Sequence, residues 1–271
     1  METKARRYLI TILMGTLLVI GCANEQKIKS EYDLRQKQNV TTEVKRHWAL
    51  GCAAVLIERY HGRHDSLSPS KINERNIQKE KELLNEWWGI NSRNDLFDNL
   101  LWLYGEGHRK KFDEMGKHVT ALSEEEYSHF LQRNMDDQEI AQEIRIAKEY
   151  YQKLGSKGIL GWDYSRYICL CRWGYLIGYL SEEEAWQLIM EAARVLQKKF
   201  DSWEDLGRNY LIGRQFWSYK ETIEAGYEYD DAHQRLLDMP SSPWNKYPWD
   251  MDLTDTETIS EPNKANMAKK Q

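Results

Sequence analysis

The chain has 271 residues, a formal net charge of −5, 41% hydrophobic residues and 30% charged residues. This is an ordinary globular composition, so most of the chain should bury a core rather than stay unfolded. No long basic run interrupts the body of the sequence, which argues against a nucleic-acid partner.

The N-terminus has the pattern of an export signal. Three basic residues precede a mostly apolar run over residues 8–20, which is too short to span a membrane comfortably. The following Val19-Ile20-Gly21-Cys22 resembles the lipobox of bacterial lipoproteins, in which the cysteine is acylated, by palmitate among other chains, and becomes the new N-terminus. We therefore expect a lipoprotein signal peptide over residues 1–21 and a lipid anchor on Cys22. A plain signal peptide and an uncleaved anchor are the alternatives.

The residue after the cysteine bears on localisation. Ala23, not aspartate, follows Cys22. By resemblance to sorting in enteric bacteria, this implies a lipoprotein of the outer membrane that faces the periplasm. Polar residues 22–40 form the expected tether between lipid and domain.

Helical periodicity recurs along the body, and strand-like alternation persists nowhere. Four of the five prolines lie at Pro240 or later, which leaves a long body free of helix breakers. Before the central stretch described below, we expect helices over residues 42–60, 70–86, 92–108 and 136–154, with another that starts at Ser123. A last helix is expected over residues 224–237. The prediction is an all-α fold, an irregular bundle of roughly eight to ten helices in a single domain over residues 41–237.

The remaining segment, residues 238–271, contains prolines and tryptophans and then becomes acidic and polar. Its aromatic residues are candidates to fold back onto the body. Beyond Asp252 the composition predicts a disordered tail.

A histidine pair follows the first predicted helix. His61 and His64, three residues apart, stand beside Asp65, and these residue types bind metals. The stretch nevertheless has the character of a polar, solvated turn, and no further ligand is evident. We therefore expect no metal, and no motif implies a cofactor.

Three cysteines remain after Cys22. An exported protein can oxidise its thiols. Cys169 and Cys171, however, are two apart on a predicted helix and point in different directions. The odd number and the apolar neighbours favour buried free thiols at these two positions and at Cys52.

The stretch from Trp162 to Trp217 contains three predicted helices with aromatic faces. The first runs from Gly161 to Tyr179, the second is capped by Ser181, and the third starts at Asp201 or Ser202. Helical spacing places two arginines, Arg166 and Arg214, among aromatic residues that should face inward. The candidate network is formed by Trp162, Asp163, Arg166, Trp173, Glu184, Trp203, Tyr210, Arg214 and Trp217.

A buried guanidinium needs a partner, since an unpaired one costs several kcal/mol. Asp163 lies one turn before Arg166 and can pair with it, and Glu184 and Glu204 are the other candidates. In a structural interpretation, these groups form a closed network that fixes the packing of the helices. In a functional interpretation, an arginine faces a cleft and awaits a carboxylate or phosphate.

The sequence contains no catalytic triad pattern, phosphate-binding loop, metalloprotease motif or zinc cluster, which argues against a standard hydrolase or nucleotide enzyme. An enzyme of unrecognised type would use His108, Asp163 or Glu184 as acid or base. His108 falls at the end of a predicted helix, where the dipole favours a protonated imidazole, although a packed or capping histidine explains it as well.

These residues carry a family resemblance. The matching segments are Trp48 with Leu50-Gly51 and Ala54-Val55-Leu56, Trp88-Gly89-Ile90, Trp102-Leu103 with Gly107-His108-Arg109, Trp162-Asp163 with Arg166, Trp173-Gly174, Glu184-Ala185-Trp186, Phe200 with Ser202-Trp203, and Tyr210 to Trp217. In these segments the chain resembles a bacterial family known as domain of unknown function 1266. The resemblance implies one continuous domain and supplies no activity, cofactor or catalytic residue.

The sequence thus favours a membrane-tethered binding or envelope-interaction protein over an enzyme. A toxin-neutralising immunity protein is one form of this hypothesis, with the membrane reached through the lipid and a protein as partner. The alternatives are the enzyme of unrecognised type and a purely structural domain.

Overall fold

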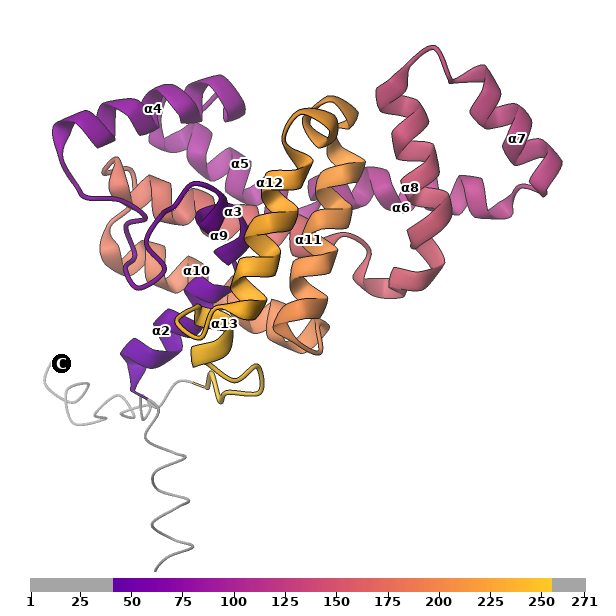
Figure 1. The fold of residues 1–271 in the computed structure, drawn as a ribbon. Helices are drawn as coiled ribbons and strands as arrows, with labels where there is room; N and C mark the ends of the chain where they lie inside the picture. Colours follow the sequence, from indigo (N-terminus) through magenta and orange to yellow (C-terminus); the bar gives the residue numbers. More distant parts are fainter. Residues whose placement is uncertain (1–40, 255–271) are drawn as a thin grey trace, which may run out of the picture. The chain divides into compact units, whose positions relative to one another are not determined.

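The computed structural model describes residues 41–254 (Figure 1). The expected signal peptide, Cys22, the whole of the expected tether and the last part of the tail lie outside these residues. The helices are α2 (Thr42–Gly51), α3 (Ala54–Arg59), α4 (Glu74–Trp88), α5 (Arg93–Gly105), α6 (Gly107–Ala121), α7 (Glu124–Arg133), α8 (Gln138–Leu154), α9 (Leu160–Leu176), α10 (Glu182–Lys199), α11 (Trp203–Trp217), α12 (Tyr219–Asp238) and α13 (Pro243–Lys246), with a 3-10 turn at Gly155–Lys157.

The all-α prediction is confirmed for the described part of the chain, which contains no strand. Ten helices have ten or more residues, and α3 and α13 are shorter. None of the helices between residues 41 and 254 combines the length and the apolar character that crossing a bilayer requires.

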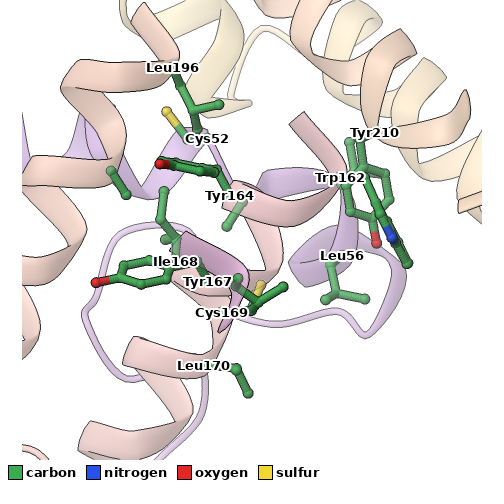
Figure 2. Close-up of a cluster of buried hydrophobic side chains, with 14 of the residues drawn as sticks. Cys52, Leu56, Trp162, Tyr164, Tyr167, Ile168, Cys169, Leu170, Leu196 and Tyr210 are labelled. Carbon is green, nitrogen blue, oxygen red and sulfur yellow. The ribbon is translucent and has the colours of Figure 1, made fainter. Parts of the chain in front are cut away.

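Helix α9 is the centre of the body formed by Lys45–Leu253. Fifteen of its 17 residues are buried, so it is enclosed on all sides. Helices α3, α5, α6, α10 and α11 pack around it, whereas α8 packs mainly against α6 and α11. Figure 2 shows the α9 side chains Tyr164, Ile168 and Leu170 within this core. Because α9 also carries Asp163, Arg166 and Arg172, charged groups are enclosed along with the apolar ones.

The predicted helix starts are confirmed where the sequence supplies a cap. Ser92, Ser123 and Ser181 each accept a hydrogen bond from the backbone N–H three residues on, and the acid at that position bonds back to the serine N–H. Ser202 likewise accepts from the N–H of Asp205 at the start of α11. These contacts satisfy donors that the first turn of a helix leaves free.

The predicted helix over residues 42–60 is divided by a turn after Gly51. Two carbonyls at this turn have partners from distant helices. Trp244 Nε1 donates to the Gly51 carbonyl at 2.9 Å, and Ser165 Oγ donates to the Cys52 carbonyl at 2.7 Å. The tertiary bonds therefore compensate for the helical bonds lost at the turn.

The segment after α12 returns to the body through tryptophans. Trp48, Trp203 and Trp249 lie with their ring centroids 4.6–5.1 Å apart, and Trp244 stacks on Trp203 at 6.2 Å. Trp48 Nε1 donates to the Pro248 carbonyl, and Trp203 Nε1 donates to the Tyr247 carbonyl. Residues 239–253 are therefore part of the packed domain rather than a detached tail.

The three described cysteines are buried free thiols, as predicted. Burial raises the pKa of Cys169 to about 12, so this thiol stays protonated at neutral pH. Cys169 is therefore disfavoured as a nucleophile, because that role requires the thiolate.

Candidate functional site

A fully buried carboxylate, that of Asp163 in the first turn of α9, has four donors. It accepts from the backbone N–H groups of His108 and Arg109, each at 3.0 Å, and from Arg109 Nη1 at 3.1 Å and Arg166 Nη2 at 2.8 Å. Burial by itself raises the pKa of Asp163. The hydrogen bonds and the Arg166 charge outweigh it and hold that pKa below its ordinary value.

Asp163 caps a helix to which it does not belong. The residue before α6, Glu106, makes no capping hydrogen bond, whereas Asp163 receives the first N–H groups of α6. Gly107 has a φ of +56°, and a Cβ there would lie 2.2 Å from Asp163 Oδ2. Only glycine fits this approach. The negative charge also stabilises the positive end of the α6 dipole.

Arg166 completes the network. Its Nη2 bonds Asp163 and lies 2.8 Å from His108 Nδ1, and its Nε donates to the Trp162 carbonyl at 3.1 Å. The guanidinium stacks 3.9 Å from the Trp162 ring centroid and 5.3 Å from that of Trp88. Since Arg166 is only 5% exposed, this arginine is closed off by its partners and does not face a cleft.

The prediction for His108 at a helix end was wrong. His108 lies in the first turn of α6, where the dipole disfavours a protonated ring. Arginine has no acceptor, so Nδ1 must accept the Arg166 hydrogen bond, which requires a neutral imidazole. Burial, aided by the Arg166 charge, lowers the pKa of His108. The interpretation as a packed histidine fits this geometry.

Arg109, which sequence reasoning missed as a member of the network, joins it to the preceding helix. Its two terminal nitrogens donate to the carbonyls of Leu103 at 2.6 Å and Tyr104 at 2.5 Å, at the end of α5. The Asp163 network therefore joins α5, α6 and α9.

Arg214 has different surroundings from Arg166. It is 2% exposed, donates to the Glu221 carbonyl at 2.8 Å and stacks 4.0 Å from the Tyr229 ring centroid. The acids proposed as partners pair elsewhere: Glu204 contacts Arg208 at 2.5 Å, and Glu184 contacts Arg93 at 2.6 Å on the surface. Pairing by Glu184 or Glu204 with the buried arginines was therefore a wrong prediction.

The aromatic residues of the predicted network do not form one cluster. Trp162, Tyr210 and Trp217 lie together, with ring centroids 5.1 Å apart for Trp162–Tyr210 and 5.6 Å apart for Trp162–Trp217. Figure 2 shows the first of these pairs. Trp203 belongs to the cluster with Trp48, and half-buried Trp173 makes no ring contact with the network among the described residues.

A chain of rings leads from the network to solvent. Ring centroids are 6.5 Å apart for Trp87–Trp217, 6.4 Å for Trp162–His108 and 5.0 Å for His108–Trp102. Trp87 is 53% exposed and Trp102 is 37% exposed, and Leu101 beside Trp102 is also exposed. We call Trp87, Trp88, Trp102, His108 and Trp217 the aromatic surface.

Acidic residues border this surface. Glu86 precedes Trp87, and Asp98 and Glu106 lie one turn before and after Trp102; all three are exposed. Lys110 forms an ion pair with Glu106 at 3.0 Å, so the other two carry most of the negative charge. The two exposed tryptophans thus each have acidic neighbours, and we call Glu86, Asp98 and Glu106 the negative rim.

A concave site lies elsewhere, and sequence reasoning missed it. A pocket of about 540 Å³ is formed by the loop between α3 and α4 together with α9 and α10. Its lining includes Arg63, Ser66, Lys71, Tyr175, Glu182 and Trp186. Neither Arg166 nor Arg214 contributes to it.

The histidine turn forms no metal site in the described structure. His64 Nε2 bonds Glu58 at 2.9 Å, and no group of three metal-binding side chains occurs within residues 41–254.

A family model described as "Protein of unknown function (DUF1266)" matches residues 83–249. Two proteins of Escherichia coli (strain K12) are similar to the chain. The uncharacterized protein YbeR is 28% identical over 158 residues, which cover 55% of this chain and 66% of YbeR. The uncharacterized protein YbeU is 29% identical over 171 residues, which cover 59% of this chain and 70% of YbeU. No solved structure matches. The family match contains the Asp163 network and starts after the loop that forms the pocket.

Proposed function

Because this chain belongs to the DUF1266 family of proteins of unknown function, which carries over no activity, we propose a function from the chain's own geometry. We propose that it is a lipid-anchored binding protein of the cell envelope that recognises a partner protein through the aromatic surface. The observation that carries this proposal is the chain of rings that reaches solvent at Trp87 and Trp102.

The composition of the aromatic surface favours a protein partner. Tryptophan is enriched among the few residues that carry most of the binding energy at protein interfaces, and large rings bury much area with few rotatable bonds. The Asp163 network fixes His108 within the aromatic surface and Trp162 beneath it, so the surface loses little conformational freedom on binding.

The negative rim supports one class of occupant. Glu86 and Asp98 would repel the anionic lipids of a membrane and attract a basic protein surface. The expected partner is therefore a protein whose contact face is apolar at its centre and basic at its edge. A toxin neutralised by an immunity protein is one such partner.

Two of the three candidate catalytic residues, Asp163 and Glu184, are poorly placed for acid–base chemistry. A catalytic base must reach the proton that it abstracts. Asp163 has no exposed surface and four donors already bound, and Glu184 sits in an ion pair with Arg93 at the start of α10. The binding hypothesis requires neither group to react.

We predict that the double variant Trp87→Ala, Trp102→Ala loses the partner. Cells that express tagged full-length protein are treated with a crosslinker, and the crosslinked species are quantified after purification. Removing the two most exposed rings should reduce the captured partner at least about tenfold. Both rings are substantially exposed, so far-UV circular dichroism should show an unchanged helix content.

The matched control is Met239→Ala. Met239 is 42% exposed and directly follows the C-terminal end of α12, whereas Trp217 precedes its N-terminal end. The 20-residue helix between them is about 30 Å long. This variant should capture the partner as the wild type does. Equal capture by the double tryptophan variant, or no specific capture by the wild type, would contradict the proposal and favour a purely structural domain.

The lipid anchor is tested separately with Cys22→Ser. The wild type should incorporate labelled palmitate and sediment with the membrane fraction, because several acyl chains hold a protein firmly to a bilayer. The variant lacks the acceptor thiol and should incorporate none. Palmitate labelling of the Cys22→Ser variant equal to that of the wild type would exclude Cys22 as the acylated residue.

A further inference from the structure

The loop that forms the pocket is held by a buried cation. Arg172 of α9 has no exposed surface, and it donates to the carbonyls of Leu67 at 3.1 Å, Ser66 at 2.9 Å and Arg63. Leu67, Ser66 and Arg63 all line the pocket. The guanidinium therefore lies one layer behind the pocket wall.

Arg172 makes no direct contact with a carboxylate of the described chain, although the charge of Asp65 acts on it from a distance. None of the described acids forms an ion pair with it, and its Nη1 has no hydrogen-bond partner among residues 41–254. Burial lowers the pKa of Arg172 to about 10, so it remains charged at neutral pH. Carbonyl dipoles solvate this cation only in part, because one of its terminal nitrogens has no acceptor.

The pocket lining adds further groups suited to an anion. Lys71 is exposed and pairs with no acid of the described chain, and the hydroxyls of Ser66 and Ser70 make no hydrogen bond there. Arg63 also lines the pocket, although its Nε contacts Asp65 at 3.3 Å. On the opposite side, Glu182 accepts a hydrogen bond from Trp186 Nε1 at 3.3 Å and is the acid of the lining.

We propose that this pocket binds a small ligand that carries a carboxylate or phosphate group. The anionic group contacts Lys71 and the serine hydroxyls in front of Arg172, and the rest of the ligand lies against Tyr175 and Trp186. A volume of about 540 Å³ suits a small molecule. Since the loop precedes the segment matched by the family model, the site combines α9 and α10 of the family with a segment outside that match.

The test titrates full-length protein in detergent with inorganic phosphate and, separately, with acetate at constant ionic strength. Binding is followed by calorimetry. Saturable binding is expected for at least one anion, and the comparison distinguishes phosphate from carboxylate recognition. Lys71→Ala should weaken binding about two- to fivefold, because it removes an exposed charge contact. Lys153→Ala, the same change at an exposed lysine on α8, should leave binding unchanged.

A second pair of variants tests for an increase in anion affinity instead of a decrease. Glu182→Gln should strengthen anion binding about two- to fivefold by removing the repelling carboxylate. Glu183→Gln makes the same charge change in the same exposed turn of α10, outside the pocket lining, and should have no effect. Equal effects of the two changes would indicate general attraction to the surface and would overturn the proposal. Absence of saturable binding for both anions would overturn it as well.

Discussion

Asp163→Asn is expected to lower the free energy of unfolding by about 3–5 kcal/mol, because it removes the negative partner of a buried guanidinium. The amide places an NH2 group among four donors where the wild type has an acceptor. It also removes one of the two oxygens that cap α6 and leaves Arg166, 5% exposed, without a compensating charge. Chemical denaturation followed by circular dichroism measures the change.

Glu204→Gln is the control for this prediction. It makes the same acid-to-amide change in the first turn of α11, where Glu204 pairs with Arg208 on the surface. Exposed ion pairs contribute little, so the loss should stay within about 1 kcal/mol. If Asp163→Asn costs no more than this control, the network does not determine the packing of α5, α6 and α9.

Gly213→Ala is expected to destabilise the domain by at least about 3 kcal/mol, because overpacking forces neighbouring atoms to move. A Cβ at Gly213 would lie 2.2 Å from the Trp162 Cβ and 2.7 Å from its Cγ. These atoms are close to the α9 backbone and cannot rotate away. The two helices would have to separate, which would also disturb the stacking of Trp162 on Arg166.

The same substitution at Gly226 should act in the opposite direction. Gly226 lies inside α12, and a Cβ there would meet only Thr222 Cγ2, at an ordinary 3.7 Å. Alanine favours a helix over glycine by about 0.5–1 kcal/mol, so Gly226→Ala should raise the free energy of unfolding by that amount. Two destabilising results of similar size would show that the effect is not specific to the contact at Trp162.

The features that the sequence predicted well depend on residues close together in the chain. The Asp163–Arg166 pair was predicted because residues three apart are neighbours on a helix. Ser92 and Ser181 marked helix starts for the same local reason. The all-α class was predictable because helical periodicity repeats in every segment.

The features that it missed depend on contacts between distant segments. His108 and Arg109 meet Asp163 across 55 and 54 residues, and no local pattern specifies that approach. Helical periodicity predicts which face of a helix a residue lies on. It does not predict which other elements the residue contacts at its position along the helix. Trp203 and Arg214 share a helix, yet 11 residues separate them by about 16 Å, and each belongs to a different cluster.

The pocket could not be predicted because its loop has no periodicity. Its conformation is set by the three carbonyls that Arg172 holds, and carbonyls are present at every residue. The sequence shows an arginine on α9 without showing that its partners are backbone atoms more than 100 residues away.

The cap that α6 receives from α9 makes the order of folding interdependent. The first turn of α6 begins at a glycine with positive φ and has no capping side chain of its own, so this helix is poorly nucleated in isolation. The first turn of α6 becomes stable only when Asp163 of α9 binds its N–H groups. Forming that contact requires closing a loop of 55 residues, which has an entropic cost. Helix α8 packs along α6 (Figure 1) and should order in the same cooperative step, so α6 and α8 should gain and lose their structure together with α9.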